Sequence, residues 1–109
     1  MSIIAFYIAT ASREEANRMA LTLLEEKLIA CANILGEATS LYVWEGKLCD
    51  TPETSVIAKT TTVLAEKAVA RARELHSYEC PCIVTWPITG GYAPFLEWVE
   101  AEVKPAKPA

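Results

Sequence analysis

Residues that can bind a metal gather in one short stretch, Glu74 to Ile83, which holds the only histidine and two of the four cysteines. His76 precedes Cys80 by four positions and Cys82 by six. Thiolate and imidazole are the ligands that Cu(I), Cu(II) and Zn prefer. A helix ending just after the histidine would bring these groups together, and Cys31 joins them if its strand ends near that helix. We therefore predict a metal site for Cu(I), Cu(II) or Zn, made by His76, Cys31, Cys80 and Cys82.

The same residues allow two other interpretations. Cys80 and Cys82 can pack as small hydrophobic side chains on opposite faces of a strand, with His76 favoured at a helix C-terminus by the helix dipole. In that case His76 alone binds Cu(II) weakly at the surface. A nucleophilic Cys31 or Cys80 with His76 as base would need a third group to orient the base. The sequence supplies no such group, so we predict a protein that is not an enzyme.

A second candidate site is a small-molecule cleft between protomers, which needs aromatic walls and a few polar groups. Alternatively, its aromatic residues form the core of a subunit interface, with Lys59 and Glu79 as an ion pair at the rim. The predicted ligand-binding residues are Trp44, Lys59, Tyr78, Glu79 and Trp98.

Composition limits the class of protein. The chain has 109 residues, enough for one domain, and 52% of them are hydrophobic, three being Trp. Such an apolar load in a small domain predicts burial between subunits. The net charge is −4 without a basic stripe, which excludes duplex nucleic acid as a partner. The apolar start lacks a preceding basic residue and is too short to span a bilayer, so we expect a cytoplasmic protein with reduced thiols and no membrane insertion.

Hydrophobic periodicity predicts four strands and three helices. Ser12 and Glu15 form a capping box, which places the start of the first helix. Asp50, Thr51 and Pro52 are expected to form the hairpin turn, and Thr62 to cap the second helix. Glu45 and Gly46 are expected to form a bulge or a tight bend inside the preceding strand. The predicted strands are 3–10, 29–35 continued at 39–48 after an interruption at Gly36, 54–61 and 82–88; the helices are 13–28, 63–75 and one that starts at Pro94.

The order strand, helix, strand, strand, helix, strand predicts an α+β fold of the ferredoxin-like type, with one extra C-terminal helix. Its helices cover one face of the sheet and leave the other bare. The single domain is expected to span residues 1–103, followed by a disordered tail at 104–109.

Several segments together resemble the divalent-cation tolerance protein CutA family. They are Cys31–Ile34, Ser40–Lys47, Lys59–Thr61, Glu74–Pro81 and Trp98 three positions after Phe95. The resemblance implies a homotrimer with an architecture akin to the PII proteins, and a role in binding copper or other divalent ions for metal tolerance. A small-ligand sensor or protein-interaction scaffold is the alternative. The chain departs from the family pattern at four positions. Ser77 stands where the family usually has Pro, and Cys80 where it usually has an aliphatic residue or Thr. Cys82 replaces the usual Glu, and Phe95 the usual Tyr.

Overall fold

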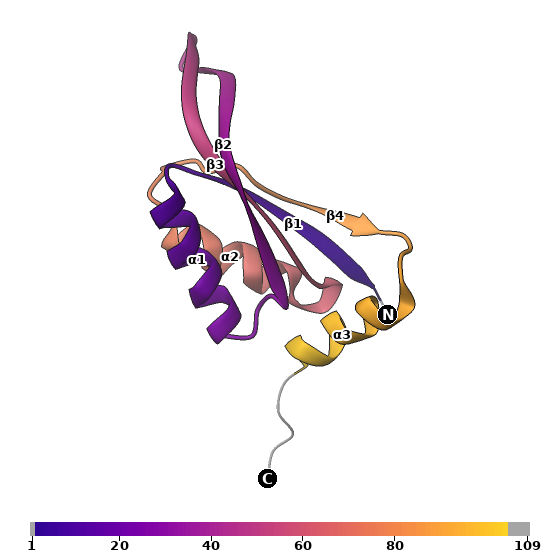
Figure 1. Cartoon of the computed structure of the whole chain (residues 1–109). Helices are drawn as coiled ribbons and strands as arrows, with labels where there is room; N and C mark the ends of the chain where they lie inside the picture. The colour runs from indigo at the N-terminus through magenta and orange to yellow at the C-terminus, as the bar shows by residue number, and fades with distance from the viewer. Residues whose placement is uncertain (1, 105–109) are drawn as a thin grey trace.

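The computed structural model describes residues 2–104 and shows a four-stranded sheet, three α-helices and one turn of 3-10 helix (Figure 1). In chain order the elements are β1 (Ile3–Thr10), α1 (Arg13–Glu25), β2 (Cys31–Trp44), β3 (Lys47–Thr61), a 3-10 turn (Thr62–Leu64), α2 (Ala65–Leu75), β4 (Ile83–Ile88) and α3 (Ala93–Val103).

The sheet is antiparallel throughout, with strand order β2-β3-β1-β4. β1 lies in the middle, paired with β3 on one side and with β4 on the other. This order confirms the predicted α+β fold of the ferredoxin-like type with an additional C-terminal helix.

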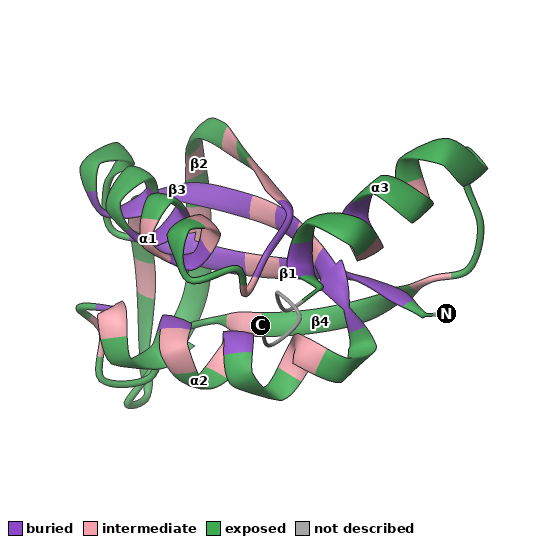
Figure 2. Cartoon of the chain, turned by 90° about the horizontal axis from the view of Figure 1, so that it is seen from below, coloured by how far each residue is buried: buried purple, intermediate pink, exposed green. Residues whose placement is uncertain are grey.

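Alternation along β1 decides which face of the sheet is covered. Ile4, Phe6 and Ile8 point toward α1 and α2 and form the main core with Val56 of β3 and Met19 of α1. Because side chains alternate along a strand, the residues between them belong to the opposite face. In Figure 2 the buried colour follows β1 and the part of β3 that pairs with it. By contrast, β4 and the end of the β2–β3 hairpin around its turn are largely exposed.

The opposite face of the sheet, here called the open face, is only partly covered. α3 packs Val99 and Val103 against the end where Ile3 and Ile88 pair. Farther along, the side chains of Leu35, Val84 and Trp86 remain exposed to between 42% and 47%. A single chain therefore leaves part of this apolar face without a covering layer.

β2 and β3 extend beyond the other strands as a long two-stranded arm (Figure 1). The predicted hairpin turn at Asp50–Pro52 is wrong, since the chain turns at Glu45 and Gly46, whose φ angles are 50° and 77°. Pro52 pairs with Thr39 inside the arm, where β3 has β2 as its one neighbour within the described residues. A proline is tolerated there because its missing N–H lies on an unpaired edge.

Other boundaries are close to those predicted. Ser12 caps α1, as expected, and the predicted interruption at Gly36 is a register shift between Leu35 and Glu37 within one continuous strand. Thr62 does not cap α2; its hydroxyl instead donates to the backbone oxygen of Ser2. In the predicted tail, residues 105–109 lie outside the described part of the chain. None of the helices described is long and apolar enough to cross a membrane.

Candidate functional site

A cavity of about 680 Å³ lies on the open face, where the arm leaves the sheet and the loop before β4 begins. We call it the arm pocket. Its wall carries four aromatic side chains, two carboxylates and two thiols. These are Tyr7, Tyr42, Trp44, Tyr78, Glu53, Glu79, Cys80 and Cys82.

Three of the five predicted ligand-binding residues line this pocket, namely Trp44, Tyr78 and Glu79. Lys59 does not, since it lies near the C-terminal end of β3 and donates from Nζ to Asn33 Oδ1 at 3.4 Å. Trp98 lies on α3, with its ring 5.8 Å from that of Phe95. The predicted five-residue cleft is thus divided in one chain, and Glu79 and Lys59 do not form the expected rim pair among the ion pairs of residues 2–104.

His76 follows the last turn of α2, and both of its ring nitrogens are engaged. Nδ1 accepts a hydrogen bond from the N–H of Tyr78 at 3.1 Å, so Nε2 carries the proton and donates to the backbone oxygen of Ala9 at 2.7 Å. The side chain is buried, with 7% of its surface exposed. In this state neither nitrogen has a free lone pair for a metal ion.

A carboxylate holds the next residue of the same loop. Glu15 of α1 accepts from the N–H of Ala11 at 2.9 Å and from the N–H of Ser77 at 3.0 Å. Burial raises the pKa of Glu15, but hydrogen bonds from Ser77 and Ala11 and the nearby His76 outweigh it, so the pKa lies below its ordinary value. Glu15 therefore ties the start of α1 to the loop that carries the thiols.

Cys80 and Cys82 are exposed, free thiols that line the same pocket. The alternative that placed them on opposite faces of a strand does not hold, because both precede β4, which begins at Ile83 rather than at Cys82.

Cys31 is distant from this pair. It begins β2 at one edge of the sheet, whereas Cys82 precedes β4 at the other edge. Three strand spacings separate these edges, which is about 14 Å. The predicted four-residue metal site is therefore not assembled within one chain, and residues 2–104 contain no group of three or more His, Cys, Asp or Glu placed to hold an ion.

Tyr78 connects the loop to the arm. Burial, followed by a hydrogen bond to the carboxylate of Glu53 and its negative charge, raises the pKa of Tyr78 to about 12. Its ring also lies 4.8 Å from that of His76. The phenol therefore stays protonated at neutral pH, and Glu53 lies close to it beside the pocket.

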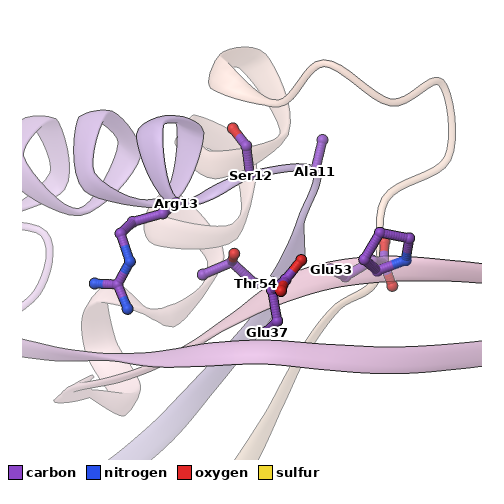
Figure 3. A pocket seen from close by; sticks show the side chains of 7 residues that line it. Ala11, Ser12, Arg13, Glu37, Glu53 and Thr54 are labelled. Carbon is purple, nitrogen blue, oxygen red and sulfur yellow. The ribbon is translucent and has the colours of Figure 1, made fainter.

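A second pocket of about 460 Å³ lies at the start of α1 (Figure 3). Ser12 and Arg13 border it from the helix, and Glu37 and Thr54 border it from the two strands of the arm. It contains none of the residues predicted to bind a metal or a small molecule.

The family model described as CutA1 divalent ion tolerance protein matches residues 4–102, nearly the whole described chain. The chain belongs to the CutA1 divalent ion tolerance family. It is 40% identical over 98 residues to the divalent-cation tolerance protein CutA of Archaeoglobus fulgidus, covering 90% of this chain and 95% of the relative. The chloroplastic CutA of Arabidopsis thaliana is 36% identical over 97 residues, which cover 89% of this chain and about half, 53%, of that relative.

Solved structures agree with this family assignment. The periplasmic divalent cation tolerance protein CutA of Archaeoglobus fulgidus has a TM-score of 0.90 at 38% identity, covering 94% of this chain and 99% of that one. CutA1 from Oryza sativa has a TM-score of 0.92 at 31% identity and covers 97% of both chains. Family membership and fold are thereby established for this CutA1 chain.

Sequence reasoning missed three pocket residues of this CutA1 protein, Tyr7, Tyr42 and Glu53. The error in the hairpin turn explains Glu53, which was placed just after a turn and is instead buried inside β3. Placing the turn at Glu45 and Gly46 would have paired the strands correctly and put Glu53 on the same side of the arm as Tyr42.

Proposed function

We propose that this CutA1 chain forms a homotrimer that binds divalent cations, copper among them, and serves metal-ion tolerance or response. The observation that carries the proposal is the arm pocket, in which two free thiols and the carboxylates of Glu53 and Glu79 face one cavity. Thiolates suit copper and zinc, and carboxylate oxygens are also ligands of divalent ions. Within residues 2–104 these groups are not placed as a set of three or more around one ion, so a second chain has to contribute ligands. The family description, CutA1 divalent ion tolerance protein, supports the same role. The proposed function is binding, without a catalytic step.

The arm supports the proposed assembly. Leu41 and Val43 of β2 and Leu48 of β3 share the side of the arm that faces away from Tyr42 and Trp44, and they are 74%, 64% and 90% exposed. An apolar face of this kind marks a protein contact. In a trimer, the face would be buried against a neighbouring copy, and the neighbour would supply the metal ligands that one chain lacks.

The cytoplasm is the proposed compartment, because the four cysteines are free and a reducing environment keeps thiols in that state. Relatives are described as periplasmic and as chloroplastic. Fractionation of cells that express the full chain tests this point.

Calorimetric titration of the wild type with Zn²⁺, and with Cu²⁺ in parallel, tests the binding function. Zn²⁺ is included because it undergoes no redox reaction with thiols. Saturable binding is expected, and it persists in a His76→Ala variant because His76 has no free nitrogen. Heats no larger than those of dilution for both ions would contradict the proposed function.

Sedimentation velocity tests the assembly. The wild type is expected to sediment as three chains of 11.9 kDa each, and Val43→Glu as a monomer, because a carboxylate would then be buried in the interface. Lys47→Glu at the end of the same arm is the matched control, since its side chain belongs to the other side of the hairpin. A wild-type monomer at micromolar concentration, or an intact trimer of Val43→Glu, would contradict the proposed assembly.

A further inference from the structure

Cys80, Pro81 and Cys82 form a short, stiff segment that carries two free thiols. Pro81 has its φ angle fixed by its ring, and the residue before a proline is restricted to extended backbone. In extended backbone, side chains two positions apart point to the same side. Both sulfur-bearing side chains line the arm pocket, in agreement with this geometry.

The segment is held at both ends by hydrogen bonds to the body of the protein. The backbone oxygen of Cys82 accepts from the N–H of Ala9 at 3.1 Å. On the other side, the N–H of Tyr78 donates to His76 Nδ1, and the preceding N–H donates to Glu15. These anchors on either side of the thiols reduce the conformational entropy that the segment loses when it binds a ligand, which favours binding.

The spacing of the thiols suits one metal ion between them. Two positions of extended chain separate Cα atoms by about 6.6 Å. Two thiolates on one ion lie at most about 4.6 Å apart, twice a typical metal–sulfur distance of about 2.3 Å. The difference of about 2 Å is within the range that rotation about the Cα–Cβ bonds of two cysteines spans.

The number of ligands indicates which ion fits. Structural Zn²⁺ sites take four ligands, whereas residues 2–104 place no third His, Cys, Asp or Glu in a metal-binding group with these thiols. Soft thiolate ligands select Cu(I), which is satisfied by two of them. The aromatic side chains of Tyr42 and Trp44 line the same cavity.

We propose that Cys80 and Cys82 bind one Cu(I) ion per chain as a bis-thiolate. Each thiol releases its proton, two new Cu–S bonds form, and no electron is transferred. The inference rests on the proposed function for the choice of copper, but it concerns the monovalent ion and a pair of residues in which this chain departs from the family pattern. Because protons are released, binding weakens as pH falls.

Anaerobic titration with Cu(I) in competition with a chromogenic Cu(I) chelator tests the proposal on the full chain. The wild type is expected to bind one Cu(I) per chain. Cys80→Ser and Cys82→Ser should each lower the Cu(I) affinity by at least about 100-fold. Substitutions of residues that only contact a metal ligand already cost up to roughly 100-fold, and these two remove a ligand itself. Cys49→Ser, which removes a free thiol from the arm outside the pocket lining, is the matched control and should bind within about twofold of the wild type. Circular dichroism verifies that each variant is folded.

A second measurement needs no variant. Bound Cu(I) should protect Cys80 and Cys82 of the wild type from alkylation while Cys49 still reacts, as read by mass spectrometry of peptides. Equal alkylation of all three with and without Cu(I), unchanged affinity of the double variant, or one ion per three chains would each overturn the bis-thiolate.

The outcomes separate this inference from the proposed function. Zn²⁺ binding by the wild type, with Cu(I) affinity equal in the wild type and the double serine variant, would overturn the bis-thiolate alone. Tight Cu(I) binding lost in the double variant, without any binding of Zn²⁺ or Cu²⁺ by the wild type, would support the bis-thiolate and contradict the divalent function.

Discussion

The imidazole of His76 donates from Nε2 to the backbone oxygen of Ala9, which joins the end of α2 to the end of strand β1 across 67 positions of sequence. Together with the bond from the N–H of Tyr78 to Nδ1, this contact uses both ring nitrogens of the buried side chain. His76 therefore acts as a connector that shapes the thiol loop. It is not available as a metal ligand in this conformation.

His76→Ala should lower the free energy of unfolding by about 1–3 kcal/mol, because a buried backbone acceptor and a backbone donor both lose their partner. Zn²⁺ affinity should change little. Urea denaturation and calorimetry measure the two quantities on one preparation. Arg73→Ala, an exposed change in the last turn of α2, is the control and should be close to neutral. Abolished Zn²⁺ binding by a folded His76→Ala protein would restore the histidine as a ligand.

Glu15→Gln should destabilise the protein at neutral pH by about 1–3 kcal/mol. The two carboxylate oxygens of Glu15 accept one N–H each, from Ala11 and from Ser77, whereas a glutamine amide has a single oxygen and leaves one of these N–H groups without an acceptor. The pKa of Glu15 is lowered in the folded protein, so its contribution to stability is present above the ordinary value of 4.5 and is lost as pH falls through the lower folded value. The difference between wild type and variant in urea denaturation should therefore shrink in acid. Glu14→Gln, in the same helical turn but exposed, is the control. A difference that is constant down to acidic pH would show that the charge of Glu15 is not involved.

Local patterns determined most of the fold, and long-range pairing determined where the prediction failed. The strand at Ile3–Thr10 follows from the local run of apolar residues, and it was predicted correctly. The cap at Ser12 was also predicted correctly, because it depends on a hydrogen bond between residues three positions apart, Ser12 and Glu15. The hairpin turn was misplaced because Asp50–Pro52 has the composition of a turn. The chain turns at Glu45–Gly46 instead, where two residues of positive φ give a backbone twist that matches the twist of the flanking strands.

The site depended on the same long-range information. That Cys31 starts one edge strand and Cys82 precedes the other edge strand follows from the order β2-β3-β1-β4, which spacing along the chain does not reveal. The engagement of His76 depends on a backbone oxygen in β1. Residue types alone therefore identified the loop with the thiols but not which of its side chains are free.

Tyr78 should ionise at higher pH than an ordinary tyrosine, with a pKa of about 12. Glu53→Gln should lower this pKa only part of the way toward 10, because it removes the negative charge but leaves the burial, which is the larger cause. Ultraviolet absorbance of the phenolate during an alkaline titration measures it, with Tyr78→Phe identifying the late transition. Since the folded pKa exceeds the unfolded one, the stability linked to Tyr78 is present below about pH 10 and is lost as pH rises toward about 12. A Tyr78→Phe protein that retains the late transition would assign it to another tyrosine.

The turn of the arm offers a test in which two neighbouring substitutions have opposite signs. Both Glu45 and Gly46 have positive φ, the geometry of a two-residue hairpin turn that favours Asn followed by Gly. Glu45→Asn should therefore raise the free energy of unfolding by up to about 1 kcal/mol, because Asn tolerates this backbone region better than Glu. Gly46→Ala should lower it by about 1 kcal/mol, although open space surrounds the position, because the strain is in the backbone. Urea denaturation of the two variants and of Gly90→Ala, a glycine without positive φ and with equally open surroundings, measures the effect. Equal stabilities for Gly46→Ala and Gly90→Ala would contradict backbone strain at this turn.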